Sequence, residues 1–169
     1  MTEAVADRPS ASPLPRAAAA ARLIALLLPL SLLAAAYGSQ YFGGLFPCEM
    51  CWWQRYAHFA ALPPAALAFT SAPESSRARA FTLLAALAIS VSGAIGVYHA
   101  GVELKIFEGF TQCTGTGAVT LQEIIHAPLI RCDQVQWSFL GVSMAGWNAI
   151  LSLGGAAVIV FLTLKNRRP

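Results

Sequence analysis

Four long apolar stretches constrain the fold of this chain more than any other feature of its sequence. They cover residues 23–39, 52–69, 81–98 and 143–164. Each is close to the roughly 17 to 25 residues that a helix needs to cross about 30 Å of hydrocarbon. Ala- and Leu-rich runs of this length satisfy their backbone groups as helices, whereas a membrane barrel would show short segments of alternating polarity. The sequence therefore predicts an all-α membrane protein, a bundle of four transmembrane helices.

The composition supports one membrane domain with short polar ends. With 57% hydrophobic and 11% charged residues, the chain is much more apolar than a soluble domain. We predict a transmembrane domain at 22–165, a disordered cytoplasmic tail at 1–21 and a short tail at 166–169. A cleaved signal peptide is the alternative for the first stretch, because Arg16 and Arg22 precede an apolar run that ends in three alanines at 34–36. Cleavage would leave three spans.

The distribution of Lys and Arg predicts the orientation. Eight of the eleven basic residues flank the same ends of the four stretches: Arg8, Arg16, Arg22, Arg77, Arg79, Lys165, Arg167 and Arg168. The positive-inside rule places these ends, and both termini, in the cytoplasm. The connections at 40–51 and 99–142 then face the periplasm of a bacterium, and the spans contact lipid. No basic patch with interleaved aromatic residues indicates a nucleic-acid partner.

Both pairs of cysteines lie in these outward connections. Cys48 and Cys51 form a C-x-x-C motif where the second apolar stretch begins, and Cys113 and Cys132 lie in the long second connection. Disulfides form and persist in the periplasm. A C-x-x-C motif at a helix start brings its sulfurs close together, and the helix dipole favours a thiolate on the second cysteine. Half of a zinc site and a static disulfide remain alternatives for this motif.

Arg55 follows Cys51 by four residues and therefore lies on the same face of a helix. An arginine just inside the lipid boundary is costly without a partner, which a thiolate or an anionic cofactor would provide. Alternatively, its side chain extends to the lipid headgroups. We expect the neighbouring Gln54 to be solvated or interfacial. In the second connection, residues 118–126 predict a short amphipathic helix on the membrane surface, which either takes part in function or only covers the bundle.

Two separated cysteine pairs suit a protein that moves electrons between a soluble dithiol and a reactant in the bilayer. Thiolate attack on a disulfide passes through a mixed disulfide, so Cys113 and Cys132 can react with a protein and then with Cys48 and Cys51. The final acceptor must be hydrophobic and take two electrons, which favours a quinone. Arg55 could stabilise negative charge on the thiolate and on the quinone ring. A different class of function is a soft-metal-binding protein that uses the cysteines and nearby histidines.

The chain resembles the disulfide bond formation protein B (DsbB) family, the inner-membrane quinone oxidoreductases that reoxidise the periplasmic thiol oxidase DsbA. The resemblance covers most of the chain. It depends on Pro-Cys-Glu-Met-Cys at 47–51, on Arg55, on Cys113, and on Cys-Asp-Gln-Val-Gln-Trp-Ser-Phe-Leu-Gly at 132–141. It implies a four-helix transmembrane bundle with a short loop helix, a thiol:quinone oxidoreductase activity, ubiquinone or menaquinone as cofactor, a DsbA-like partner and no metal.

The resemblance also implies a role for each cysteine. Cys113 forms the mixed disulfide with the DsbA-like partner, Cys132 exchanges with Cys48, and Cys51 interacts directly with the quinone. The segment between Cys113 and Cys132 is shorter than in the best-known members of the family, so the partner could differ.

Other residues of the predicted quinone site are less distinctive. Arg55 matches the quinone-site arginine of the family, and Trp137 matches the tryptophan that follows the last cysteine. His99, at the end of the third stretch, is a candidate hydrogen-bond donor to the quinone, and His58 is a second candidate. Enzymes of the vitamin K epoxide reductase type would use a similar electron route, but their C-x-x-C motif comes late in the chain, whereas here it comes early.

Overall fold

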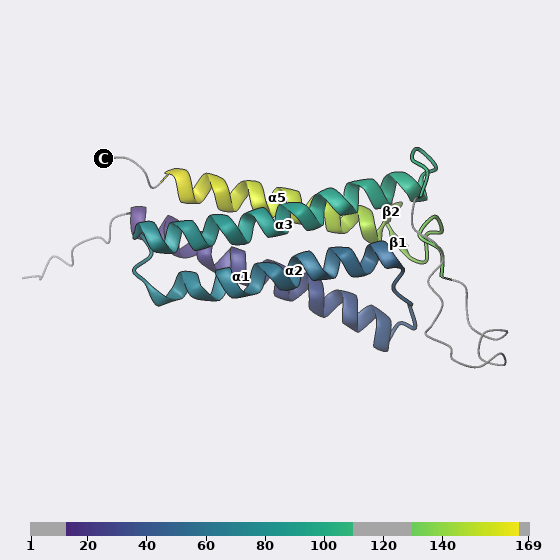
Figure 1. Cartoon of the computed structure of the whole chain (residues 1–169), viewed down its shortest axis with the longest axis horizontal. Helices are drawn as coiled ribbons and strands as arrows, with labels where there is room; N and C mark the ends of the chain where they lie inside the picture. Colours follow the sequence, from purple (N-terminus) through teal and green to yellow (C-terminus); the bar gives the residue numbers. More distant parts are fainter. Residues whose placement is uncertain (1–12, 110–129, 166–169) are drawn as a thin grey trace, which may run out of the picture.

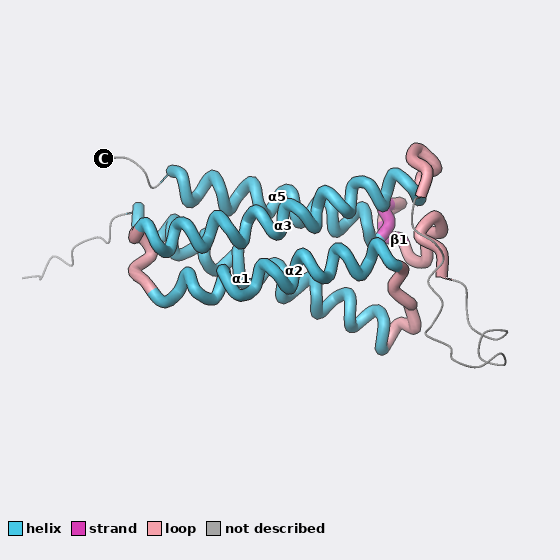
Figure 2. Tube along the Cα trace, in the orientation of Figure 1, coloured by secondary structure: helices cyan, strands magenta, loops and turns pink. Residues whose placement is uncertain are grey.

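The computed structural model describes residues 13–109 and 130–165, which fold into long helices side by side and one small hairpin (Figures 1 and 2). The elements in chain order are α1 (Pro13–Tyr41), α2 (Glu49–Leu67), the 3₁₀ helix η1 (Ala68–Thr70), α3 (Ser76–Glu103), β1 (Ser138–Phe139), β2 (Val142–Ser143) and α5 (Met144–Lys165). The amphipathic helix predicted at 118–126 lies outside the described residues.

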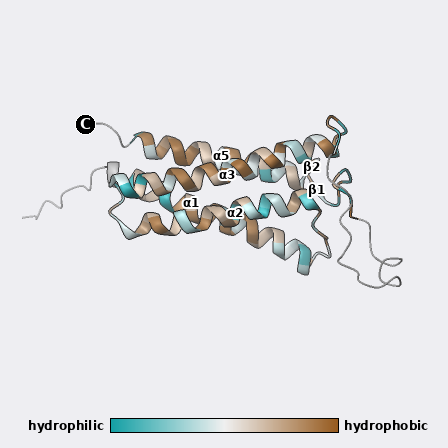
Figure 3. Ribbon diagram, viewed as in Figure 1, coloured by the Kyte–Doolittle hydropathy of each residue, from teal (hydrophilic) through white to brown (hydrophobic). Residues whose placement is uncertain are grey.

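Three of these helices are long and apolar enough to cross a membrane, which confirms a mostly helical membrane protein. They are Arg16–Tyr41, Ser76–Glu103 and Met144–Lys165. Helix α2 is long enough at 19 residues, but its polar side chains make it less apolar, so it does not join that group. The predicted fourth span at 52–69 therefore stays a prediction. Figure 3 shows polar residues on α2 between the more hydrophobic neighbouring helices.

The predicted boundary of the N-terminal tail is wrong, because α1 begins at Pro13 and includes residues that we had assigned to a disordered tail. The segment 17–21 consists of alanine, the residue with the strongest helix propensity. Proline is also favoured at the first position of a helix, where its missing N–H has no helical partner to lose. The rest of the predicted tails, 1–12 and 166–169, lies outside the described residues.

Helix α3 packs extensively against both α2 and α5, and α1 closes the bundle by packing against the same two helices. Small side chains form the core on the side of η1, where Ala61, Ala85 and Ala156 are almost completely buried. Small residues let membrane helices approach closely. A Cβ atom added at Gly96 would lie 3.0 Å from the carbonyl O of Ala145, so α3 and α5 almost touch there. By contrast, α2 and α5 make far fewer contacts.

The hairpin of β1 and β2 lies at the end of the bundle where α2 begins and α3 ends (Figure 1). Its strands pair in antiparallel register, with Phe139 opposite Val142. Leu140 and Gly141 form the two-residue turn with positive φ values of 52° and 77°, as a hairpin turn of this length requires. The indole N–H of Trp147 donates to the carbonyl O of Phe139 at 3.1 Å, which fixes the hairpin to the start of α5.

Candidate redox site

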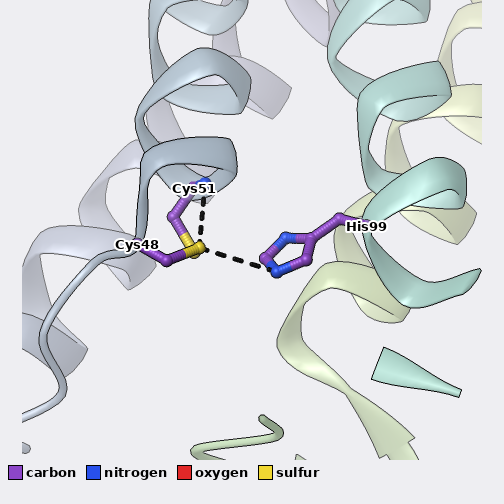
Figure 4. Close-up of side chains that lie close together, drawn as sticks. All are labelled: Cys48, Cys51 and His99. Atoms are coloured by element: carbon purple, nitrogen blue, oxygen red, sulfur yellow. Dashed lines mark hydrogen bonds between the residues drawn. The ribbon is translucent and has the colours of Figure 1, made fainter. Parts of the chain in front are cut away.

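The two cysteines of the C-x-x-C motif lie at the first turn of α2. Cys48 is the N-cap residue, and its Sγ accepts a hydrogen bond from the backbone N–H of Cys51 at 3.4 Å. This arrangement brings the two sulfur atoms to 3.1 Å from each other, both as free thiols (Figure 4). The N-terminus of a helix favours a negative charge beside it, which a thiolate provides. The motif can therefore carry one thiolate at the start of α2. With a small movement, its two sulfur atoms can also form a disulfide.

Cys132 contacts Cys48 in a buried cluster at the same end of the bundle. Met50, Val102 and Ile130 complete this cluster. Hydrogen bonds with the side chains of Cys132 and Cys51, together with burial, raise the pKa of the Cys48 thiol. Cys48 is thus the sulfur at which the two predicted cysteine pairs meet. Cys113, the fourth predicted cysteine, lies outside the described residues.

His99 projects from α3 toward the sulfur of Cys48 (Figure 4). Its Nε2 is 3.6 Å from Cys48 Sγ and 3.2 Å from the carbonyl O of Cys132, and its Nδ1 is 3.0 Å from Nε2 of Gln54. An amide nitrogen only donates, so Nδ1 accepts and Nε2 carries the ring proton. His99 therefore donates toward Cys48 and Cys132, which stabilises negative charge on the Cys48 sulfur. The sequence had suggested only a quinone contact for this residue.

Arg55 is 6% exposed and points back toward α1. Its guanidinium donates to the side-chain Oε1 of Gln40 at 2.6 Å and to the carbonyl O of Ala36 at 3.0 Å. Its Cζ also lies 4.7 Å from the ring centre of Tyr37 and 5.0 Å from that of Trp52. These contacts hold the charge inside the bundle, so the alternative of a side chain that extends to the headgroups is wrong.

A cavity of about 700 Å³ adjoins this site, a size typical of sites for small organic ligands. Its lining is mostly apolar, and α1, α2, α5 and the hairpin segment supply most of it. The thiols Cys48 and Cys51 lie on its wall, and Arg55 joins them there. Other predicted site residues on the same wall are His58, His99 and Trp137. The cavity thus brings together every predicted site residue among the described ones except Cys132, which contacts Cys48 outside the lining.

A buried polar network that the sequence did not reveal forms part of this wall and continues into the bundle. Gln54 is 6% exposed, not interfacial, and its Oε1 accepts from Nδ2 of Asn148 on α5 at 2.8 Å. Nδ2 of Asn148 also donates to the carbonyl O of Ser92 on α3 at 3.2 Å. Polar residues in membrane helices usually face a partner in the bundle. The spacing of Gln54 and His58, one turn apart in an apolar helix, is the signal that could have predicted the α2 part of the network.

An exposed ion network fixes the segment that carries Cys132. Asp133 lies 2.7 Å from Nζ of Lys105 and 2.8 Å from Nη2 of Arg131. Arg131 and then Lys105 hold the pKa of the Asp133 carboxyl well below its usual range. The network connects the residue after Cys132 to the end of α3, which also carries His99, so both groups are positioned by the same segment.

Comparison with known proteins agrees with this site. The profile of the family described as "Disulfide bond formation protein DsbB" matches residues 18–162, most of the chain. The chain belongs to the DsbB family. Relatives named "Disulfide bond formation protein B" include one from Methylococcus capsulatus, 35% identical over 146 residues, or 78% of this chain and 85% of the relative. Another, from Marinobacter nauticus, is 26% identical over 154 residues, or 86% of this chain and 92% of the relative.

No solved structure matches the chain. Membership in the DsbB family confirms the resemblance drawn from the motifs at 47–51 and 132–141. It identifies the protein as a membrane oxidoreductase that forms disulfide bonds. Cys48, Cys51 and Cys132 are free thiols in the part of the chain that the structure describes.

Proposed function

We propose that this protein is a thiol:quinone oxidoreductase of the bacterial inner membrane. In this proposal it reoxidises a periplasmic DsbA-like dithiol oxidase and so drives disulfide formation in exported proteins. One observation carries the proposal: Cys48 and Cys51 lie on the wall of an apolar cavity, while Cys132 contacts Cys48. The same sulfur is thus adjacent both to a site for a lipid-soluble molecule and to a cysteine that can exchange with it.

The residues around the cavity fit a quinone. The apolar lining suits a hydrophobic ring and tail, Arg55 offers cationic donors to a ring oxygen, and the indoles of Trp137 and Trp147 offer flat apolar surfaces. When bound, ubiquinone or menaquinone would supply a two-electron acceptor. Arg55 also favours thiolate on Cys51, which lies one helical turn away on the same helix.

The chemical steps balance through two disulfide exchanges. The reduced partner attacks the Cys113–Cys132 disulfide, leaves as an oxidised protein, and releases two thiols in this chain. Cys132 then attacks Cys48, which forms the Cys48–Cys132 disulfide and releases Cys51 as a thiolate. Attack of Cys113 on Cys132 restores the Cys113–Cys132 disulfide and releases Cys48 as a thiolate, which His99 stabilises. Oxidation of Cys48 and Cys51 back to the disulfide removes two electrons and two protons, which together reduce the quinone to the hydroquinone.

The proposal requires α2 to be the fourth span. At 1.5 Å per residue its 19 residues reach roughly 28 Å, close to the thickness of the hydrocarbon core. Its buried polar groups, Gln54, Arg55 and His58, all have partners on other helices, so they do not prevent α2 from lying in a bilayer. The basic residues Arg16, Arg77 and Lys165 flank the end away from the cysteines, which supports a cytoplasmic location for that end.

A turnover assay tests the activity. The purified full chain, given a reduced DsbA-like protein, should reduce a soluble quinone analogue, measured by the loss of quinone absorbance. Cys51→Ser should lower this rate to the uncatalysed level because no disulfide can then form at α2. The matched control is Ser152→Cys, which adds a thiol at a buried position outside the cavity lining and should retain turnover. Unchanged quinone reduction in Cys51→Ser would remove this cysteine from the mechanism.

The partner can be identified by trapping. Cys132→Ser should accumulate a mixed disulfide between Cys113 and the partner, because the thiol that resolves it is missing. Mass spectrometry of the adduct from cells grown under oxidising conditions would name the protein. If no adduct forms in Cys132→Ser while Cys113→Ser yields one, the assigned order of exchange is wrong.

Metal binding is the second candidate function. The side-chain ligand atoms of Cys48, Cys51 and His99 lie within 4.8 Å of one another, a set that suits a soft metal ion. Metal analysis of the purified protein, with a count of free thiols before and after reduction, separates the two functions. Stoichiometric metal with four free thiols would favour metal binding, and metal-free protein with two reducible disulfides would favour the oxidoreductase.

A further inference from the structure

His58 lies on the cavity wall one turn further along α2 than Arg55, and none of the steps above uses it. The side chain is 3% exposed. Its Nε2 lies 2.9 Å from Oδ1 of Asn148 on α5 and 2.9 Å from Oγ of Ser92 on α3. Two other helices therefore fix the position of the ring.

The orientation of Asn148 decides which nitrogen of His58 carries the proton. Nδ2 of Asn148 donates to Oε1 of Gln54 and to the carbonyl O of Ser92, both of which are acceptors only. Oδ1 of Asn148 therefore faces His58 and Ser152, whose hydroxyl donates to it at 3.1 Å. An amide oxygen only accepts, so Nε2 of His58 must donate to it. The neutral ring then has an acceptor at Nδ1.

This acceptor is unused. Nδ1 of His58 is buried and has no hydrogen-bond partner among the described residues. Leaving a buried acceptor unpaired is costly, so such atoms usually have a partner or serve a function. Because Ser92 and Asn148 already use Nε2, Nδ1 is the ring nitrogen that remains for a molecule in the cavity lined by His58. Less than 1 Å² of this atom is exposed, so a ligand reaches it only when the His58 ring or a neighbouring side chain moves.

We propose that Nδ1 of His58 accepts a hydrogen bond from a hydroxyl group of the molecule in the cavity, so that the cavity binds a hydroquinone more tightly than the corresponding quinone. This inference rests on the proposed function. A quinone offers only carbonyl acceptors, whereas the addition of two electrons and two protons converts both carbonyls into hydroxyl donors. His58 then favours the reduced form, while the cationic donors of Arg55 suit a carbonyl oxygen. The two residues thus recognise different oxidation states of one ligand.

Equilibrium binding tests the preference without turnover. The full chain carrying Cys48→Ser and Cys51→Ser cannot transfer electrons through α2, and the cavity tryptophans Trp137 and Trp147 report binding through fluorescence quenching. We would titrate this parent with decyl-ubiquinone and, separately, with decyl-ubiquinol under anaerobic conditions. The parent should bind the quinol more tightly. Adding His58→Leu should weaken quinol binding about tenfold, the scale of one net hydrogen bond, and change quinone binding less than about twofold.

Two further variants make the result specific. His58→Asn keeps a polar group that can present either an oxygen or an NH₂ group, so the preference for the quinol should fall while quinone binding remains. This variant also carries the test if His58→Leu does not fold, as judged by circular dichroism. The control is Ser90→Ala, which removes a hydroxyl that donates to the carbonyl O of Ala86 within α3, outside the network and the cavity lining, and should leave the preference unchanged.

Each outcome has a distinct meaning. A parent that binds the quinol no more tightly than the quinone, or a preference that persists in a folded His58 variant, would overturn the role of His58. Equal weakening of both ligands would also overturn it, because packing alone would explain that result. If neither ligand saturates the parent protein, the proposed quinone site itself fails.

Discussion

At the residue scale, the site depends on side chains that each have two functions. Cys48 caps α2 and contacts Cys132, while His99 donates toward Cys48 and accepts from Gln54. Arg55 also has two functions, because its hydrogen bonds connect α2 to α1 and its charge lies on the cavity wall. Substitutions here should therefore be compared with changes of the same type at the surface.

Arg55→Lys should weaken quinone use with little loss of folded protein. The ammonium keeps the charge, but it cannot reproduce the planar fork that contacts Gln40 and Ala36 and stacks on Tyr37 and Trp52. We expect the KM for the quinone to rise about tenfold, equivalent to about 1.4 kcal/mol.

The matched control for that measurement is Arg79→Lys, at a half-buried site outside the cavity lining where the guanidinium donates to the hydroxyl of Ser76 at 3.1 Å. It should leave steady-state kinetics unchanged. An equal KM in the two variants would show that the guanidinium of Arg55 does not contribute to quinone binding.

At the element scale, α2 carries most of the proposed redox residues, and α3 packs extensively against both α2 and α5. The sequence predicted both helices, and it predicted that Cys48, Cys51 and Arg55 would share one end of α2. It did not predict the contacts of Gln54 with His99 and Asn148, because these depend on how α3 and α5 are placed relative to α2. Periodicity within one helix identifies a polar residue, but it does not identify a partner on another helix.

Close packing of α3 on α5 should make Gly96 sensitive to substitution. A Cβ atom there would meet backbone atoms of Ala145 and Ala149 at 3.0 and 3.1 Å, so Gly96→Leu must separate the helices. Overpacking of this kind costs about 1 to 3 kcal/mol. We expect a lower Tm for purified protein in detergent, and a shifted Asn148 should also weaken quinone binding.

Gly154 on α5 provides the control, because a Cβ atom added there meets nothing within 4 Å. Gly154→Leu should retain the Tm of the unaltered protein. If both variants melt at the same temperature, the close approach at Gly96 does not limit stability.

At the scale of the whole molecule, the described redox groups gather at one end of the bundle, while most basic residues flank the other. The family resemblance had predicted this separation through its cysteine motifs, and the charge distribution had predicted it independently. The cavity, and the partners of its polar network on α3 and α5, could not be predicted, since residues from distant segments of the chain form them.

Labelling of engineered cysteines tests both the orientation and the fourth span. In a chain without its four native cysteines, Phe42→Cys places a thiol in the exposed loop before α2, where the native side chain is 95% exposed. Glu74→Cys places one in the exposed turn between α2 and α3. A maleimide that does not cross membranes should label Phe42→Cys in intact spheroplasts, but should label Glu74→Cys only after lysis.

The two positions also provide each other's control. The reverse pattern would place the redox end in the cytoplasm and contradict the proposed function. Labelling of both positions before lysis would show that α2 does not cross the membrane.

Because the sulfur of Cys48 is also the cap of α2, the redox state and the order of the first helical turn are coupled. When Cys48 turns to bond with Cys132, the backbone N–H of Cys51 loses its acceptor, and loss of an N-cap typically costs about 0.5 to 2 kcal/mol. Fraying of that turn would then accompany every exchange. The amide of Cys51 should therefore exchange its hydrogen with deuterium faster in the Cys48–Cys132 disulfide form than in the form in which Cys48 caps α2. Hydrogen exchange at this one amide would then distinguish the two redox forms.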